Sequence, residues 1–507
     1  MSACVLECGG KASPRAATPL SECSAGGRGV LLTRGQSESG VAAKARRGRL
    51  AFALPPHSKT SPFGASQSMR VRGSVLIVVL WASVGLVSLA LLLGHSMVMS
   101  YRGADNDLAG HQADLAIEGA VRYAESLLVN PTVPGVLPEA TSYEGEAVAV
   151  GEAQFWFFGT PADTTSGTQG EYGLVDEASK LNLNTATLEM LKLLPGMTAE
   201  FAAAIIDWRD TDDEVTSGGA ESETYATKKP AYKAKNAPFE SIEELALVSG
   251  ATREILYGED ANLNGVSDPN EDDGEKNLPA DNSDGKLDAG VLAYVTVFSR
   301  EPNKQADGTA RIDLSPPGPN AALEKLLTDK LSTSRAAEIL ARIGPGGGIR
   351  STLEFYVRSG MKADEFGQIA DALTVKTGDY LPGLINVNTA GAAVLACVPG
   401  IGTDKAATLV AARQSRTTTD TNIAWVVDTL GAQGAVQAGP YLTGQSWQAG
   451  VDVAAVGRHG RGYRRTKFVI DTSTGSPRII YRRNLAPLGW ALGSEVRQSL
   501  AQQKGTK

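Results

Sequence analysis

Oxygen-bearing side chains recur at regular positions in the stretch DANLNGVSDPNE, which runs from Asp260 to Glu271. The spacing matches the twelve-residue calcium loop, in which oxygens at positions 1, 3, 5, 7, 9 and 12 surround the ion. Gly265 occupies position 6, where the loop makes a sharp turn. This alignment predicts that Ca²⁺ is bound by the side chains of Asp260, Asn262, Asn264, Asp268 and Glu271 and by the backbone carbonyl oxygen of Val266.

The segment around this loop carries far more negative than positive charge. Ten Asp and Glu residues but only two Lys residues lie between Glu259 and Asp288, so the segment repels itself unless a cation neutralises it. A second loop, DNSDGKLD, begins at Asp281 and adds Asp284 and Asp288 as ligands, with Asn282 as a third candidate. No clear helix follows the first loop. We therefore predict a structural calcium site without a complete EF-hand, the alternative being a solvated acidic linker.

The remaining chemistry-bearing residues do not form a catalytic set. The sequence has no Gly-x-Ser-x-Gly motif and no glycine-rich phosphate-binding loop. Cys397 lies on an apolar helical face, which favours a core position over a nucleophile. The four histidines are scattered, without metal-ligand spacing to one another: His57, His95, His111 and His459. The sequence therefore predicts that the protein is not an enzyme.

Charge divides the chain into a basic start and an acidic remainder. Residues 1–73 contain eleven Lys and Arg against three Asp and Glu, whereas the rest of the chain contains 37 against 53. Because nucleic-acid phosphates attract positive charge, an acidic body is a poor partner for DNA or RNA. The other three cysteines (Cys4, Cys8 and Cys23) lie in the basic start, so no disulfide can form within the remainder.

One strongly apolar run follows the basic start. Residues 75–93 contain no charged side chain and would span about 28 Å as a helix, close to the ~30 Å hydrocarbon core of a membrane. Arg70 and Arg72 precede the run and should stay in the cytoplasm. Apolar residues keep a helical spacing beyond it, which predicts one long helix over residues 74–130. Residues 1–68 form either a disordered transit-type leader or a stretch before the true start at Met69.

The body contains an internal repeat without gaps, in which residues 182–209 match residues 386–413 at an offset of 204. Each copy reads as a helix capped by Asn-Thr-Ala, a turn at Pro-Gly and a second, Ala-rich helix, which is a helix-hairpin-helix pattern. A weaker echo pairs residues 240–250 with residues 350–360, and each resembles a Ser-capped helix ending at Gly.

Helix-hairpin-helix units bind DNA by presenting backbone N–H groups to a phosphate, with a basic side chain nearby. In the second copy, PGIG and Lys405 suit this role. In the first copy the second glycine is missing and Glu200 lies near the hairpin. A scaffold of small helical hairpins is therefore the favoured interpretation, because the positive surface that DNA needs is missing.

The N-terminal stretch resembles that of type IV pilin-like proteins, whose prepilin peptidase cuts after the glycine that ends the basic segment. The resemblance places the cut between Gly73 and Ser74 and implies methylation of the processed chain. Most of these proteins carry Glu at mature position five, but this chain carries Val78. The exception is typical of the minor pseudopilin K family of type II secretion.

The order of motifs in the body is similar to the same family. The shared motifs are, in order, Asp176-Glu177 with Lys180 before NLNTA, PFES at 238–241 with Glu244-Leu245, TVFS at 296–299, and NVNTA at 386–390. The resemblance implies a minor pseudopilin that caps the pseudopilus tip and helps to initiate its assembly, for export of folded proteins across the outer membrane. It also implies structural Ca²⁺ in the helical domain.

The partners implied by the resemblance are other minor pseudopilins and the pseudopilus, the inner-membrane secretion platform and the prepilin peptidase. The implied location is the bacterial inner membrane, crossed once, with most of the chain in the periplasm; nucleic acid is not an expected partner. The alternatives are a membrane-anchored helix-hairpin-helix protein for DNA binding and uptake, and an anchored periplasmic scaffold without a pilus role.

These patterns predict an α+β fold with a long N-terminal transmembrane and amphipathic helix, a pilin-like strand core and a large inserted α-helical domain with helix-hairpin-helix-like units. Expected strands are 154–158, 172–175, a pair formed by 292–299 and 311–314, and a hairpin formed by 466–471 and 478–481. The predicted divisions are a disordered leader or mis-assigned start (1–68), a prepilin-type leader (69–73), the long helix (74–130), a pilin-like strand region (131–180), a first helical part with the calcium loop (181–290), a strand pair (291–320), a second helical part (321–416) and a C-terminal region with a β-hairpin (417–507).

Overall fold

The computed structural model describes residues 74–159, 172–278, 280–318, 320–344, 348–416 and 419–503. The predictions for residues 1–73, including the leader and the cut-site residue Gly73, lie outside the described residues. The chain divides into two units, of which the first ends at Leu80 and the second runs from Trp81 to the C-terminus. The second unit contains the sheet and, with the exception of the start of the long helix, the helices described below.

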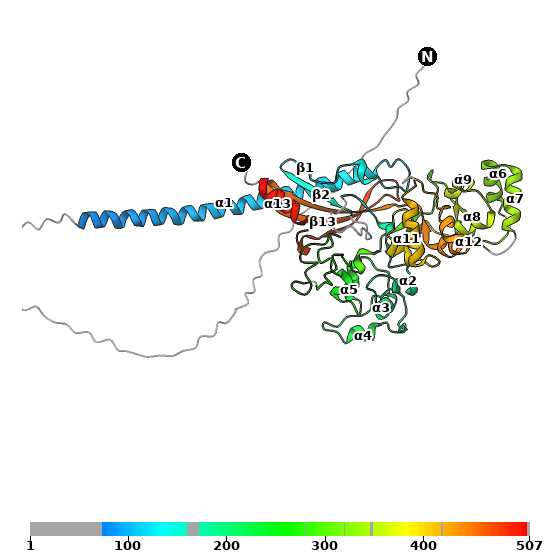
Figure 1. The fold of residues 1–507 in the computed structure, drawn as a ribbon, viewed down its shortest axis with the longest axis horizontal. Coiled ribbons are helices and arrows are strands. Elements are labelled where there is room, and N and C mark those ends of the chain that lie inside the picture. Colours follow the sequence, from blue (N-terminus) through cyan, green and yellow to red (C-terminus); the bar gives the residue numbers. More distant parts are fainter. Residues whose placement is uncertain are drawn as a thin grey trace, which may run out of the picture. The chain divides into compact units, whose positions relative to one another are not determined.

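The long N-terminal helix is confirmed. Helix α1 (Ser74–Leu128) contains 55 residues and ends two residues before the predicted boundary (Figure 1). Residues 74–104 all have exposed side chains. Among the described residues, α1 is the helix that is long and apolar enough to cross a membrane, with a mean hydropathy of 2.7 in its most apolar window. Exposed apolar surface on this scale requires a partner or a lipid environment.

The remainder of α1 packs against a six-stranded antiparallel sheet. The main strand order is β1-β2-β12-β13-β14, and β3 pairs with β12. The strands are β1 (Val148–Val150), β2 (Ala153–Phe158), β3 (Val175–Asp176), β12 (Gln448–Gly457), β13 (Arg461–Asp471) and β14 (Arg478–Asn484). The sheet therefore joins two segments that lie about 300 residues apart in the sequence.

Successive side chains of each strand point to opposite faces of the sheet. Both faces are apolar and are covered by other parts of the chain. Phe155 and Phe157 of β2 contact the alanine-rich face of α1, together with Val453 of β12. Trp156 and Phe158 point to the other face. There they contact residues near α13 (Gly493–Gln503), among them Ala491, Leu492 and Leu500. Burial on both faces explains why β2 is an uninterrupted aromatic run.

Two glycines allow α1 to approach the sheet closely. A Cβ atom at Gly457 would lie 2.0 Å from the carbonyl oxygen of Ala109, and one at Gly462 would lie 2.4 Å from the Ala109 carbonyl carbon. Gly462 also has a φ of +67°, which favours glycine. Ion pairs reinforce the contact: Asp105 pairs with Arg458 at 2.8 Å, and Glu118 pairs with Arg482 at 2.6 Å.

Eleven further helices lie between β3 and β12 in the described part of the sequence. They are α2 (Leu188–Lys192), α3 (Ala199–Arg209), α4 (Ser222–Ala226), α5 (Arg253–Tyr257), α6 (Ala321–Lys330), α7 (Thr333–Ile343), α8 (Thr352–Ser359), α9 (Ala363–Gly367), α10 (Ala392–Ala396), α11 (Gly402–Arg413) and α12 (Val426–Ala438) (Figure 1). The two repeat copies share one hydrophobic core, whereas α6–α9 surround a separate one.

Short two-stranded pairs connect these helices. β4 (Leu181–Asn182) pairs with β5 (Val295–Thr296), and β10 (Ile385–Asn386) pairs with β11 (Leu442–Thr443); both pairs are parallel. β6 (Arg300–Pro302) pairs with β9 (Tyr380–Pro382), and β7 (Ile312–Asp313) pairs with β8 (Leu373–Thr374). The strands that open the two repeat copies, β4 and β10, thus have equivalent partners.

Several strand predictions are wrong in detail. Residues 292–299 and 311–314 do not pair with each other, because β5 pairs with β4 and β7 pairs with β8. The strand predicted at 172–175 is reduced to β3. The predicted C-terminal hairpin is confirmed as β13 and β14, both longer than expected. Mixed helix and sheet with one long apolar N-terminal helix is the architecture observed.

Candidate functional site

The predicted calcium loop folds around the carboxylate of Asp260. One carboxylate oxygen accepts a hydrogen bond from the backbone N–H of Asn264 at 3.0 Å, and the other accepts from Gly265 at 2.8 Å. Leu263 and Gly265 have φ values of +55° and +68°, which close the turn. The side chain of Asp260 is buried. Glycine at position 6 therefore has the conformational role that the sequence predicts.

The other predicted ligands of this loop lie close to one another. The side-chain amides of Asn262 and Asn264 both donate to one oxygen of Asp268, at 2.7 Å and 3.1 Å. The carboxylate of Glu271 accepts from the backbone N–H groups of Ala261 and Asp268, at 3.0 Å and 3.1 Å. The buried side-chain oxygen of Asn262 has no hydrogen-bond partner among the described residues.

Burial makes the negative charge of this loop costly. Desolvation raises the pKa of Glu271 to about 8, and the charges of Asp260 and Asp268 contribute to the rise. Desolvation also raises the pKa of Asp260 to about 6. The charge of Arg465 opposes the rise at Asp260 but does not cancel it. Carboxylates that are buried together in this way are the arrangement that a bound cation stabilises.

The donor set of the loop fits Ca²⁺ chemically, since every predicted ligand is an oxygen. The structure does not bring the acids into a tight cage: among the described residues, Asp260, Asp268 and Glu271 do not have ligand oxygens that all lie within 4.8 Å of one another. Val266 donates its backbone N–H to the side chain of Asn264 at 2.8 Å. The loop is therefore closed by its own hydrogen bonds.

The second predicted loop is more exposed than the first. Asp284 and Asp288 both have exposed side chains, and the carboxylate of Asp288 accepts from the Asn282 amide at 3.1 Å. Glu259, which directly precedes the first loop and is not among its predicted ligands, connects the two loops. Its buried carboxylate accepts from the backbone N–H groups of Asn282 and Asp288, at 3.2 Å and 2.8 Å.

The first loop is attached to the sheet by Arg465 of β13. This side chain is fully buried and forms a two-pronged ion pair with Asp452 of β12, at 2.7 Å and 3.0 Å. It also donates to the backbone carbonyls of Asn262 and Leu263. The amide of Asn264 adds a hydrogen bond to the carbonyl of Ala491. Sequence reasoning does not reveal this attachment, because its members lie about 200 residues apart.

A second buried polar centre surrounds the motif residues Asp176 and Glu177. The carboxylate of Asp176 accepts from the backbone N–H of Ala178 and from the side chains of Asn386, Thr389 and Ser446. Desolvation raises the pKa of Asp176, and these hydrogen bonds act in the opposite direction. Asp176 therefore ties the start of the first repeat region to the NVNTA motif of the second.

Glu177 makes a different set of contacts. Its carboxylate accepts from the hydroxyl of Thr296 and pairs with Lys180 at 3.3 Å and with Lys467 at 4.0 Å. Burial raises the pKa of Glu177, but the two lysines and the hydroxyl outweigh burial, and the pKa lies below its usual value. The Asp-Glu motif, the TVFS motif and β13 thus meet at one buried point.

The repeat copies fold alike, with a short helix, a turn and a longer helix in each. Gly196 and Gly400 of the Pro-Gly turns both have positive φ, at +68° and +87°. The arginine shared by the two copies, Arg209 or Arg413, donates to backbone carbonyls at the start of its own copy. The predicted cap is misplaced: in the first copy the helix cap is Thr187, which accepts from Met190.

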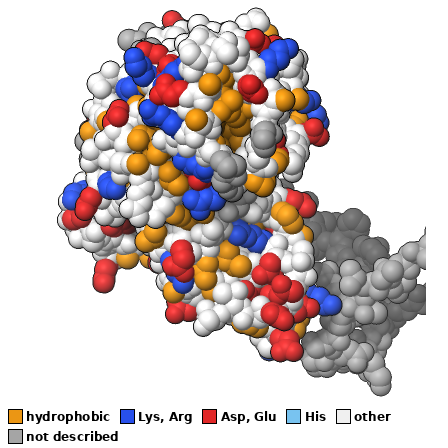
Figure 2. Space-filling view, turned by 90° about the vertical axis from the view of Figure 1, so that its right-hand side faces the viewer, with side chains coloured by type: hydrophobic (Ala, Val, Ile, Leu, Met, Phe, Trp, Pro, Cys, Tyr) orange, Lys and Arg blue, Asp and Glu red, His pale blue; other side chains and the backbone are white. Residues whose placement is uncertain are grey.

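The hairpin of the second copy is covered by the chain itself. A Cβ atom at Gly400 would lie 2.7 Å from the carbonyl oxygen of Gly434 in α12. The ammonium of Lys405 donates to the carbonyl of Leu430 at 3.1 Å. On the face of the molecule in Figure 2, basic side chains lie among acidic ones over the upper part, and acidic side chains gather at the lower right. Gly400 and Lys405, two of the features that would bind a DNA phosphate, are thus engaged in internal packing.

The segment that contains the Asp-Glu motif and the first repeat copy has known relatives. Residues 172–257 match the model of a protein family. That family is type II secretion system (T2SS) protein K. The protein K match includes α2 to α5 and ends before the calcium loop.

A solved structure shows similarity to a larger part of the chain. The chain is similar to one in the crystal structure of the GspK-GspI-GspJ complex of the type 2 secretion system of enterotoxigenic Escherichia coli, with 12% sequence identity and a TM-score of 0.38. The likeness covers 74% of this chain and 96% of that chain. No curated protein matches the chain.

Proposed function

We propose that this chain is a minor pseudopilin of the type II secretion system, of the protein K type. The match of residues 172–257 to the protein K family carries the proposal. The role is structural: the protein caps the tip of the pseudopilus, helps to initiate its assembly, and so serves the export of folded proteins across the outer membrane. It is not an enzyme; Cys397 is buried, and desolvation raises the pKa of its thiol to about 12.

Helix α1 supports the proposed location in the bacterial inner membrane, with most of the chain in the periplasm. Its apolar first part has exposed side chains, and its second part holds the sheet. Prepilin peptidase cutting after Gly73 would leave Ser74, the first residue of α1, as the new N-terminus. Val78 then occupies mature position five. In the pilin-like proteins that the chain resembles, this carboxylate pairs with the N-terminal amine of the subunit above or beside it, so a subunit at the tip does not need it.

The proposed partners are other minor pseudopilins, the pseudopilus and the inner-membrane secretion platform. The exposed apolar part of α1 is the surface for packing beside neighbouring N-terminal helices. The bulky helical part between β3 and β12 would prevent the addition of a further subunit above this one. Nucleic acid is not a proposed partner, since Lys405 and the Gly400 hairpin are engaged internally.

Membrane attachment and partner capture are tested together. We expect the full chain to fractionate with the inner membrane and to co-purify in detergent with other pseudopilins of the same cell. Leu86→Arg places a charge near the middle of the apolar run at a cost of about 3 kcal/mol, so both membrane retention and co-purification should fall.

The matched control for this test is Leu278→Arg, which changes a leucine that is 85% exposed and lies outside α1. This control should behave as the wild type. Membrane retention without any associated pseudopilin would contradict the proposed function and favour an anchored scaffold.

We also propose that the loop Asp260–Glu271 binds structural Ca²⁺. Millimolar Ca²⁺ should raise the thermal midpoint of the chelator-treated protein, with about 2.7 kcal/mol of added stability at a concentration of 100 Kd. Asp260→Asn with Glu271→Gln should remove the part of this gain that the loop contributes, because both carboxylates lose their charge. Scanning calorimetry with and without chelator measures it.

Asp329→Asn, on the exposed side of α6, is the matched control for removing an acidic charge elsewhere. It should keep the full Ca²⁺ response. An equal response in the loop variant and in this control would show that the loop does not bind the ion.

A further inference from the structure

A cavity of about 520 Å³ lies between two separately packed parts of the chain. Phe366 and Leu373 of one wall belong to the core of α6–α9, and Ile423 and Leu442 of the other wall belong to the core of the two repeat copies. The volume is within the range of small-molecule sites, roughly 300–1,000 Å³, and such sites are frequent where two packed parts of a protein meet. The cavity is therefore large enough for a ligand and lies where ligand sites are common.

The guanidinium of Arg311 lines this cavity and is incompletely hydrogen-bonded. Its Nη1 donates to Glu301 at 2.6 Å, and its Nη2 donates to Asp371 at 3.2 Å. The side chain of Arg311 is only 5% exposed, and its buried Nε–H has no hydrogen-bond partner among the described residues. A buried donor without an acceptor is unfavourable. An acceptor oxygen from a ligand would complete this group.

The charges of the cavity walls are largely balanced. Four acidic side chains line the cavity, against the two basic side chains of Arg311 and Lys376. Arg311 pairs with two of the acids, Asp420 pairs with Arg416, and the fourth acid, Asp364, has an exposed side chain. The surplus of acids would repel an anion, and a cation would find no buried carboxylate without a partner in the described walls. The walls therefore favour an uncharged ligand.

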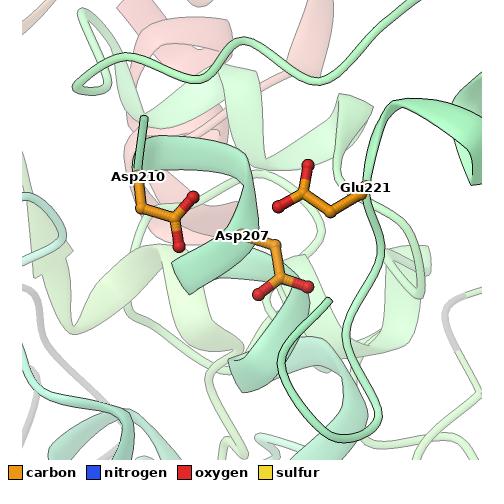
Figure 3. Close-up of side chains that lie close together, drawn as sticks. All are labelled: Asp207, Asp210 and Glu221. Atoms are coloured by element: carbon orange, nitrogen blue, oxygen red, sulfur yellow. The ribbon is translucent and has the colours of Figure 1, made fainter. Parts of the chain in front are cut away.

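A different arrangement of acids occurs at the C-terminal end of α3. Carboxylate oxygens of Asp207, Asp210 and Glu221 lie within 4.8 Å of one another there (Figure 3). Neither oxygen of Glu221 has a hydrogen-bond partner among the described residues. In the cavity, by contrast, a guanidinium bridges two of the carboxylates, and the acids of the described walls form no such group. The cavity therefore differs in kind from a cluster of unbalanced carboxylates.

Hydroxyl groups are the most numerous polar side-chain groups of the cavity. They belong to Ser351, Thr352, Thr374, Thr419, Thr421 and Thr443. Each hydroxyl can donate one hydrogen bond and accept others, as the hydroxyls of a sugar can. The hydroxyls of Thr352 and Thr421, both partly buried, form no hydrogen bond with another described residue. Leu384 and Pro440, also partly buried, add apolar surface for the C–H groups of a sugar ring.

We propose that this cavity binds an uncharged saccharide. The buried Nε–H of Arg311 donates to a sugar oxygen, and the hydroxyls of Thr352 and Thr421 exchange hydrogen bonds with sugar hydroxyls. A free oligosaccharide and a glycan strand of the cell wall share this chemistry. The proposal concerns binding alone and does not depend on a role in secretion, so it can fail or hold independently of the proposed function.

Equilibrium dialysis tests the proposal with two radiolabelled probes, maltotriose and triacetylchitotriose. The full chain is held in a detergent without a sugar headgroup, because such a headgroup would compete. We expect saturable binding of at least one probe, at one site per chain. Arg311→Lys keeps the positive charge but lacks the Nε–H, and Thr352→Val with Thr421→Val removes two hydroxyls. Each of these variants should weaken binding at least tenfold.

The matched control is Thr333→Val. Thr333 is the first residue of α7, as Thr352 is of α8, but it is exposed and does not line the cavity. This variant should bind the probe as the wild type does. If Arg311→Lys does not fold, as judged by circular dichroism, the double threonine variant decides, because both of its positions are only partly buried.

Competition experiments identify the source of the saccharide. Displacement of the probe by peptide-free glycan strands would support the proposal with a cell-wall glycan as the ligand, and binding without such displacement would support it with a free saccharide. The proposal is overturned if neither probe binds at millimolar concentration, or if the folded variants bind as tightly as the wild type. Tighter binding of triglycine than of either saccharide would also overturn it, in favour of a polypeptide ligand.

Discussion

Replacing Arg465 with methionine is expected to destabilise the protein by about 3–5 kcal/mol. The guanidinium is fully buried and forms a bidentate pair with Asp452 while it donates to the carbonyls of Asn262 and Leu263. Methionine keeps much of the volume, but it leaves the carboxylate of Asp452, which is only 13% exposed, without its guanidinium partner. Denaturant unfolding of the full chain in detergent, at fixed Ca²⁺ concentration, measures the loss.

The matched control is the neighbouring Arg464→Met. Arg464 is 41% exposed and pairs with Asp114 of α1, which is 55% exposed, at 2.8 Å. Exposed ion pairs contribute about 0–1 kcal/mol, so this variant should remain close to the wild type. Equal losses in the two variants would show that Arg465 contributes only as an ordinary residue of β13. Arg465→Met should in addition weaken Ca²⁺ binding, because Arg465 holds two carbonyls of the loop in place.

The second large effect is expected for Asp176→Ala, with a loss of at least about 3 kcal/mol. The change leaves the buried Ala178 N–H and the side chains of Asn386, Thr389 and Ser446 without their acceptor. Each buried donor left without a partner costs about 1–3 kcal/mol. Glu189→Ala, at an exposed pair with Lys192, is the control and should change stability by less than about 1 kcal/mol.

The pH dependence of stability separates the role of Asp176 from simple packing. Burial raises its pKa in the folded state, so the folded protein holds a proton that the unfolded chain releases near pH 4. The contribution of Asp176 to stability therefore falls as the pH rises from about 4 through the folded pKa. Asp176→Asn, which cannot ionise, should remove this fall. An unchanged pH profile in Asp176→Asn would contradict the assignment.

The parts of the fold that the sequence predicts are those with local signals. Helix α1 follows from an uncharged run and a continuing helical period, and the hairpin of β13 and β14 from two short runs around a turn. Strand β12 is missed, although it is the centre of the sheet. Its stretch QAGVDVAAVG is made mostly of small residues, because β2, β13 and the backbone of α1 leave little room there.

The candidate sites, too, could be predicted only where their residues are close together in the sequence. The loop Asp260–Glu271 is visible in the sequence because its proposed ligands follow one another at fixed spacing. Arg465 gives no such signal, since its role depends on contacts with the loop, which lies about 200 residues away in the sequence. The strand at 311–314 is mispaired for the same reason: β8, its true partner, lies about 60 residues further along the chain. Pairing over such distances is decided by packing of the whole core.

The N-terminus of the mature, membrane-bound protein tests the central proposal most directly. Mass spectrometry of the chain purified from membranes should find Ser74 as the first residue, with the apolar run of α1 retained. A cut at this bond leaves the membrane helix attached to the sheet, as a pseudopilin requires. A membrane protein that keeps residues 69–73, or a soluble product that begins after residue 93, would contradict the proposal.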